Sequence, residues 1–141
     1  MQHALAEPES AEDNSQSVEC VGFSSDTRWL ASGGMNKTVT IWDISSGSKR
    51  VECLHEDGVV SVLWHPALPF FCSASLDSRV RVWDARSGNC LLSLDGHTNF
   101  ILNMVSLFDA NDGNAVIATV SDDQTAKIFM VDFQALSRAN S

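Results

Sequence analysis

The sequence predicts an all-β fold of repeated four-stranded sheets, about three blades of a larger β-propeller. The main evidence is a repeat: Thr38 to Asp43 aligns without a gap with Arg79 to Asp84, and Trp83 follows Trp42 by 41 residues. A third copy begins at Thr125, and its Phe129 follows Trp83 by 46 residues. A period of about 40 to 45 residues is the length of one propeller blade.

Each copy also contains the other strands of a blade, as short alternating or β-branched runs between turn residues. The first copy predicts strands over 18–23, 29–33, 38–42 and 50–54, and the second over 59–64, 70–75, 79–84 and 90–94. The third predicts strands over 101–107, 115–120 and 126–131 and has no clear fourth strand. No sizeable window shows helical periodicity. The expected organisation is an acidic flexible segment or inter-blade insert (1–16), three blades (17–54, 55–94 and 95–133) and a tail (134–141).

A set of polar residues recurs in register with the aromatic residue of each copy. A hydroxyl stands ten residues before it, a polar turn residue six before it, and a histidine precedes the second and third copies. We expect these side chains to form a hydrogen-bonded relay inside each blade, running from Asp through His and Ser to the indole N–H of Trp. The residues predicted in this structural role are His55, Ser73, Asp77, Trp83, His97, Thr119, Asp123, Ser32 and Trp42.

The same residue types occur in hydrolase triads, but the rest of such a site is missing from the sequence. A nucleophilic serine needs an exposed oxygen and an oxyanion site, and no Gly-x-Ser-x-Gly elbow or Gly-x-x-x-x-Gly-Lys phosphate loop occurs. The segment 109–113 resembles a calcium loop only in part, because its glycine comes one place early and Val120 stands at the twelfth position. We therefore predict no catalytic residue, no metal site and no cofactor.

The composition excludes several classes of partner. The chain carries 18 acidic and 9 basic residues, a net charge of −9, which opposes binding to nucleic acid. No run approaches the ~18 apolar residues of a membrane span, and the first residues do not form an export signal. The four cysteines, at 20, 53, 72 and 90, have no chelating spacing and are predicted as buried free thiols. A cytoplasmic location follows, with the nucleus as a second possibility.

The span from Ser17 to Val131 resembles the C-terminal repeats of the angio-associated migratory cell protein family, whose members are WD-repeat propellers. The stretches 17–23, 75–88 and 124–129 carry the resemblance, and the acidic, serine-containing segment 7–13 is similar to an insert that the family has between blades. The resemblance implies a cytoplasmic, largely non-catalytic propeller of about eight blades, the others lying upstream. It departs from the pattern near Asn14, where a histidine is missing, and at Phe129-Met130, which replaces Trp-Asp.

The charge distribution suggests a protein partner. The loops between blades, and those between the second and third strands of a blade, carry six acidic residues and only two nearby basic ones, Lys37 and Arg79. Other basic residues lie in the loops at the opposite end of the strands. We expect a scaffold that binds a basic segment of a protein, such as a ribosomal protein during ribosome assembly. The family resemblance implies this partner, because fungal relatives of the family act as chaperones of a large-subunit ribosomal protein. Asp77 and Asp123 are assigned to the relays, so the predicted contacts are Glu56, Asp57, Asp95 and Asp122.

A different class of function competes with this one. Trp83-Asp84-Ala85-Arg86 matches the Trp-Asp-x-Arg element found in substrate receptors of cullin-type ubiquitin ligases. In this alternative, Arg86 is the cation that docks on the ligase adaptor.

Overall fold

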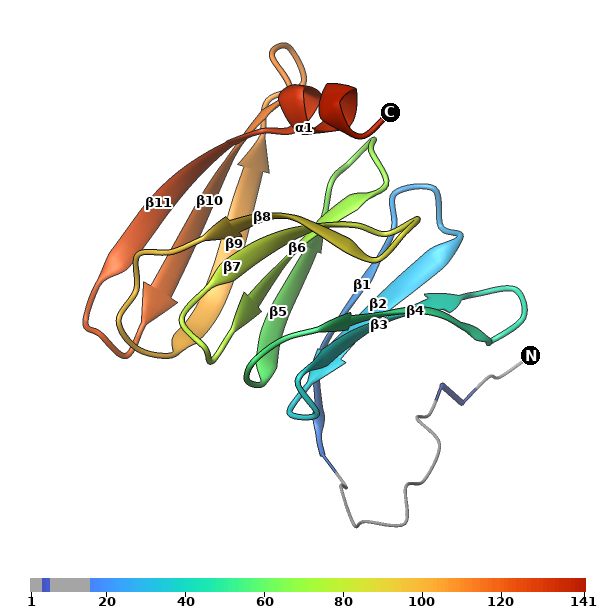
Figure 1. Cartoon of the computed structure of the whole chain (residues 1–141), viewed down its shortest axis with the longest axis horizontal. Coiled ribbons are helices and arrows are strands. Elements are labelled where there is room, and N and C mark those ends of the chain that lie inside the picture. The colour runs from blue at the N-terminus through green and yellow to red at the C-terminus, as the bar shows by residue number, and fades with distance from the viewer. Residues whose placement is uncertain (1–3, 6–15) are drawn as a thin grey trace.

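The computed structural model describes residues 4–5 and 16–141, which form three antiparallel sheets lying side by side like the blades of a fan (Figure 1). The sheets have four, four and three strands, so the all-β class and the incomplete third sheet are confirmed. Most of the insert expected over 1–16 lies outside the described residues.

The first sheet contains β1 (Val18–Phe23), β2 (Trp29–Gly34), β3 (Thr38–Asp43) and β4 (Lys49–Leu54). The second contains β5 (Val59–Trp64), β6 (Phe70–Ser75), β7 (Val80–Asp84) and β8 (Asn89–Leu94), and the third β9 (Ile101–Phe108), β10 (Asn114–Ser121) and β11 (Ala126–Asp132).

The strands lie where the turn residues and the alternation of apolar and polar residues predicted them. Those predicted over 18–23, 59–64 and 70–75 have the same bounds as β1, β5 and β6, and every other one agrees within one residue at each end. Consecutive strands pair antiparallel in chain order within each sheet. The first strand of each sheet contains a register shift near its start, at Val18/Cys20 in β1 and Val59/Ser61 in β5. The three copies therefore share one backbone plan.

The segment expected to be a tail instead forms the helix α1 (Phe133–Ala139). Asp132 caps its N-terminus, because its carboxylate accepts the Ala135 N–H at 3.0 Å. Phe133 is fully buried, and its ring lies 4.9 Å from that of His65 and 5.9 Å from that of Phe108. Burial of Phe133 thus stabilises a helix that is too short to be stable by itself.

Two hydrophobic clusters hold the sheets together, and the middle sheet contributes to both. Phe71 and Trp83 belong to the cluster shared with the first sheet, while Phe70 and Val82 belong to the cluster shared with the third. Because successive residues of a strand point to opposite faces, every residue of β6 and β7 is buried. The middle sheet therefore has no solvent-facing side along these strands.

The two outer sheets expose the positions that their neighbours bury. The first strands of the three sheets have one equivalent position, occupied by Val21, Val62 and Met104, which pairs with a hydroxyl residue of the second strand. Val62 and Met104 are buried at this position, whereas Val21 is 64% exposed. Ile41 and Val82 are likewise fully buried, whereas Ile128, at the same place in the third sheet, is 72% exposed. We call these exposed faces of the first and third sheets the outer flanks. Their apolar character matches that of the buried interfaces between the sheets.

The turns between the second and third strands of each sheet share an unusual backbone. Lys37, Ser78 and Gln124 occupy the same place in these turns and have φ values of 68°, 75° and 69°, in the left-handed region. The preceding Asn or Asp side chain accepts the backbone N–H two residues further on, as in the bond from Arg79 N–H to Asp77 Oδ1 at 3.0 Å. This Asx geometry explains the polar residue that recurs six places before each aromatic residue.

Candidate functional site

In the second sheet, three of the four predicted relay residues are joined by hydrogen bonds. The Trp83 indole N–H donates to Ser73 Oγ at 2.9 Å, and Ser73 Oγ lies 2.7 Å from His55 Nε2. His55 Nδ1 lies 3.0 Å from the carbonyl oxygen of Cys53, so Nδ1 carries the proton and Nε2 accepts from the Ser73 hydroxyl. Ser73 is fully buried, so its hydroxyl cannot reach a substrate.

Asp77, the fourth predicted member of this relay, does not bond to His55. Its carboxylate instead forms an ion pair with Arg81, with 2.6 Å between Asp77 Oδ2 and Arg81 Nη2. Burial by itself would raise the pKa of Asp77, but the Arg81 guanidinium and the backbone N–H groups of Arg79 and Glu56 together outweigh it and hold that pKa below its usual value. Burial, assisted by the nearby Arg81 charge, lowers the pKa of His55 to about 4. The full set expected from the sequence is therefore split into a His–Ser–Trp relay and an Asp–Arg pair.

The other two sheets contain different parts of the relay. In the third, His97 Nδ1 lies 2.7 Å from Asp123 Oδ2, and Nε2 lies 2.6 Å from Thr119 Oγ1, but Phe129 has no N–H to continue the chain of bonds. Hydrogen bonding from Thr125, followed by that from His97, holds the pKa of Asp123 well below its usual value. In the first sheet, Trp42 donates to Ser32 Oγ at 2.8 Å, and no histidine of the described residues takes part. Within the described part of the chain, an Asp–His contact is thus present only in the third sheet.

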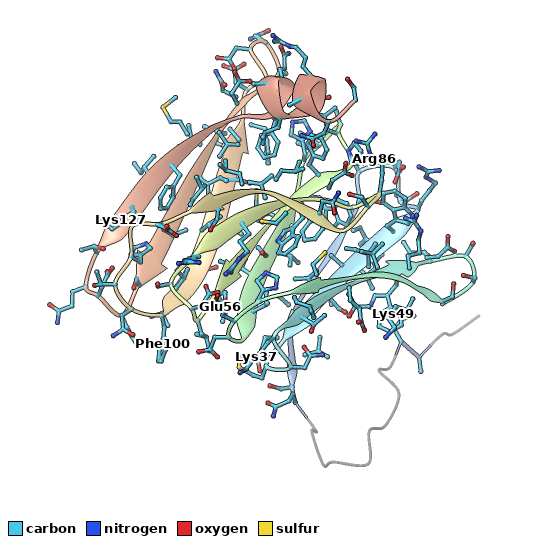
Figure 2. The ribbon with its side chains drawn as sticks, viewed as in Figure 1. Lys37, Lys49, Glu56, Arg86, Phe100 and Lys127 are labelled. Atoms are coloured by element: carbon cyan, nitrogen blue, oxygen red, sulfur yellow. The ribbon has the colours of Figure 1, made fainter. Side chains whose placement is uncertain are left out.

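The loops that carry the predicted acidic contacts lie together along one rim, where Figure 2 shows Lys37, Glu56 and Phe100. We call this set of loops, 35–37, 55–58, 76–79, 95–100 and 122–125, the acidic rim. Glu56 and Asp122 are exposed and form no ion pair with the described residues. Asp57 is half-buried and accepts the N–H of Gly58 at 2.7 Å. These three carboxylates remain available to a partner.

The fourth predicted contact is already paired. Asp95 Oδ1 lies 3.0 Å from Arg79 Nε, and both side chains are exposed. A surface ion pair of this kind contributes about 0–1 kcal/mol, so a partner can displace it at little cost. Asp95 therefore lies on the acidic rim with its carboxylate paired to Arg79, unlike the carboxylates of Glu56 and Asp122.

The acidic rim also carries apolar side chains that the sequence did not single out. Phe100 is exposed, and its carbonyl oxygen accepts the N–H of Asp122 at 3.0 Å. At the equivalent place in the second sheet, Leu76 donates its N–H to the carbonyl of Gly58, and Met35 lies close to this glycine. The signal in the sequence was the position of Phe100, a large apolar residue directly before the first strand of a blade.

Arg86 lies away from the acidic rim, near α1 (Figure 2). Its guanidinium is held by Asp84, with Nε 3.0 Å from Oδ1 and Nη2 2.9 Å from Oδ2, and it lies 5.8 Å from the ring of Phe70. The Arg86 side chain is 48% exposed. The cation of the Trp-Asp-x-Arg element is thus accessible, although the Asp84 carboxylate occupies one edge of its guanidinium.

The cysteines are free thiols, as expected, but they are not all buried. Cys53 and Cys72 are buried, Cys20 is half-buried, and Cys90 is exposed because it lies on β8, an outer strand of its sheet. In the described part of the chain, no three His, Cys, Asp or Glu residues are grouped closely enough to hold a metal ion. The one described helix is far too short to cross a membrane.

Comparison with known proteins agrees with this architecture. The family model "WD domain, G-beta repeat" matches residues 9–43, 48–84 and 88–129. The angio-associated migratory cell proteins of Homo sapiens and Canis lupus familiaris are each 38% identical to this chain, over 92% and 87% of its length. Protein HIR1 of Mycosarcoma maydis is 31% identical over 87% of the chain.

These relatives are considerably longer than this chain. It spans 29% and 27% of the two angio-associated migratory cell proteins and 14% of HIR1. The crystal structure of Saccharomyces cerevisiae Sqt1 superposes with a TM-score of 0.79 at 20% identity, covering 89% of this chain and 34% of that one. Three matched repeats, three blade-like sheets and the internal Ser–Trp and His–Ser–Trp bonds lead to one conclusion: the chain belongs to the WD-repeat family.

Proposed function

We propose that this chain is part of a protein-binding scaffold whose acidic rim grips a basic segment of another protein. The observation that carries the proposal is that Glu56, Asp57 and Asp122 form no ion pair with any described residue and lie on the same rim as exposed Phe100. A WD-repeat propeller is a protein-interaction scaffold, and its family is generally non-catalytic. The specific partner belongs to the proposal, and a ribosomal protein under assembly is the kind of basic partner that we favour.

The balance of charges on the acidic rim supports a cationic ligand. Asp77 is neutralised by Arg81, Asp95 by Arg79, and Asp123 is bonded to His97. The remaining carboxylates, of Glu56, Asp57 and Asp122, form no ion pair with any described residue, and the basic side chains close to the rim loops include Lys37 and Lys127. Complementary charge of this kind accelerates encounter and selects the partner, while an exposed aromatic residue contributes apolar contact area.

A charge-reversal experiment tests this proposal. Glu56, Asp57 and Asp122 are changed together to Lys, and binding of a fluorescent lysine- and arginine-rich ten-residue peptide is measured by anisotropy at several salt concentrations. We expect affinity to fall at least tenfold and the salt dependence to become shallower, because about three charge contacts are lost.

The matched control reverses three carboxylates that lie outside the acidic rim, Glu19, Glu52 and Asp112. This variant has the same net charge as the first one, so a general effect of the protein's field would weaken binding equally in both. Equal weakening would contradict a specific acidic rim, and unchanged binding in the rim variant would exclude the proposal.

The alternative function, a substrate receptor of a cullin-type ubiquitin ligase, is favoured by the accessible position of Arg86. It uses a different surface from the acidic rim, so one pull-down separates the two. Recovery of a ligase adaptor that is lost in Arg86→Glu and retained in the rim variant would support the receptor function. Recovery of basic proteins that is lost only in the rim variant would support the scaffold.

We also propose that further sheets of the same ring cover the two outer flanks. Support comes from Val21 and Ile128, which are exposed although their equivalents between sheets are buried, and from the chain's coverage of less than a third of its migratory cell protein relatives. Hydrogen exchange on a longer form of the protein that contains such sheets tests this. Val21 and Ile128 amides should be more protected there than in the present chain.

A further inference from the structure

A pocket of about 540 Å³ opens between the second and third sheets, on the side where α1 lies. Its walls come from the loop that joins β5 to β6, the loop that joins β9 to β10, and the exposed side of α1. A volume of this size lies within the range of ~300–1,000 Å³ that is typical of small-ligand sites. The pocket contains none of the residues of the acidic rim.

Aromatic and aliphatic side chains form one side of the pocket. His65 and Phe108 line it with their rings edge to face, 5.1 Å apart, and Leu68 lies beside them. Buried Phe133 supports this pair from behind, with its ring 4.9 Å from that of His65. Rings held by one another in this way offer a preformed surface for an apolar group.

His65 also presents one defined hydrogen-bond donor. Its Nδ1 accepts two backbone N–H groups, from Ala67 at 3.0 Å and from Leu68 at 2.9 Å, so the proton of the neutral ring is on Nε2. Burial lowers the pKa of His65, which keeps the ring neutral at physiological pH. Nε2 has no hydrogen-bond partner among the described residues. His65, a residue of the pocket lining, therefore has an oriented Nε2–H donor that no described residue accepts.

The charged residues of the lining are Arg138 and Asp109. Among the described residues, the Arg138 guanidinium makes one hydrogen bond, a long one of 3.4 Å to Gln134 Oε1. The Asp109 carboxylate accepts the N–H of Asn111 at 2.8 Å, within its own loop. His65 Nε2 and the Arg138 guanidinium are thus two lining donors that remain open to a ligand, whereas the Asp109 carboxylate already accepts a hydrogen bond within its own loop.

We propose that this pocket binds an apolar carboxylate. The ligand's hydrocarbon or aromatic group would pack on His65 and Phe108, and its carboxylate would accept from His65 Nε2–H and from the Arg138 guanidinium. The C-terminal residue of a peptide and a free fatty or aromatic acid both have this chemistry. The site is independent of the acidic rim, so it holds whether or not the proposed function does.

Two pairs of probes test the proposal on the 141-residue chain. The first pair is 4-phenylbutyrate and its neutral amide, and the second is an acetylated dipeptide ending in phenylalanine, with a free carboxylate or with an amide. Saturation-transfer NMR detects contact, and calorimetry gives the affinity. We expect each acid to bind about fivefold or more tightly than its amide, which corresponds to about 1 kcal/mol. Tighter binding of the dipeptide acid identifies a peptide C-terminus as the source, and tighter binding of phenylbutyrate identifies a free acid.

Variants of the lining separate the contributions. Arg138→Gln should weaken acid binding about fivefold, Asp109→Asn should strengthen it by removing a repelling charge, and Ala110→Trp should block the pocket for both members of each pair. Arg28→Gln, an exposed arginine of the first sheet, is the matched control and should change nothing. Equal affinity of acid and amide, no saturable binding in the parent chain, or equal effects of Arg138→Gln and Arg28→Gln would each overturn the proposal.

Discussion

Trp83 is the side chain whose removal should be most damaging to the structure. It is buried in the cluster between the first and second sheets, its ring stacks on Phe71 at 6.4 Å, and its N–H bonds to Ser73. Truncation of a buried tryptophan to alanine costs about 3–5 kcal/mol, and the lost hydrogen bond adds about 1 kcal/mol. Because whole domains are stable by only ~5–15 kcal/mol, Trp83→Ala should unfold a large fraction of the molecules.

Trp83→Phe separates the hydrogen bond from the packing. The smaller ring leaves a cavity of roughly 40 Å³, which costs about 1 kcal/mol, and loss of the N–H donor costs about as much again. Urea denaturation followed by circular dichroism measures the free energy of unfolding of both variants. We expect a loss of about 2 kcal/mol for Trp83→Phe, with an unchanged dependence on urea concentration.

Phe129→Ala is the matched control, because Phe129 has the equivalent position in the third sheet. Phe129 is only half-buried, donates no hydrogen bond, and lies in a sheet with a single neighbour, so its truncation should cost less than that of Trp83. A Trp83→Ala variant as stable as the parent, or a Phe129→Ala variant that is more damaging, would refute the assignment of Trp83 to the central interface.

Three further predictions concern pH, association and backbone strain. Burial lowers the pKa of His55 to about 4, below the ~6.5 of an unfolded histidine, so the unfolded chain binds more protons between these values and stability should fall as the pH drops from 6.5 to 4. His55→Gln should flatten this part of the pH profile relative to the parent, and identical slopes would contradict it. The apolar outer flank around Ile128 and Met130 should make the chain self-associate, which sedimentation velocity can measure; Ile128→Lys with Met130→Lys should reduce association, and Gln124→Lys should not. Gly88 has φ +77° and an added Cβ would lie 2.4 Å from Val51 Cγ1, so in thermal melts Gly88→Ala should cost ~1–3 kcal/mol more than Gly47→Ala, which shares the positive φ; equal costs would count against the clash.

The strand pattern could be predicted because it depends on local chemistry that repeats three times. Alternation, β-branched residues and Asx turns act within a few residues, and the repeat period aligns them in each copy, so the strand bounds agree within one residue at each end. The Ser–Trp bonds in the first two sheets follow from the same register. Pairing of Ser73 with Arg81 across β6 and β7, for example, places Ser73 next to the strand that carries Trp83.

Two features depended on contacts that the repeat does not contain. Arg81 is four residues from Asp77 and lies on the same strand face as Trp83, which brings its guanidinium to the Asp77 carboxylate. Because a charged guanidinium binds a carboxylate more strongly than a neutral imidazole does, Asp77 pairs with Arg81 and not with the expected His55. The helix α1 depends on Phe133, which fills space between two sheets. Asp132 followed by good helix formers was a capping signal, but a seven-residue segment gives no helical period that can be recognised.

The double-sided burial of β6 and β7 has a consequence for how this protein tolerates sequence change. A strand with one wet face accepts substitutions at every second residue, but these two strands have no such residue. A change in side-chain volume at Phe70 disturbs the packing of the cluster shared with the third sheet. A backbone shift that accommodates it also moves the adjacent Phe71, which belongs to the cluster shared with the first sheet. In the middle sheet, variation that is neutral for the fold is therefore concentrated in the outer strand β8 and in the loops. Those loops include part of the acidic rim, so the proposed binding surface can change in sequence far more easily than β6 and β7 can.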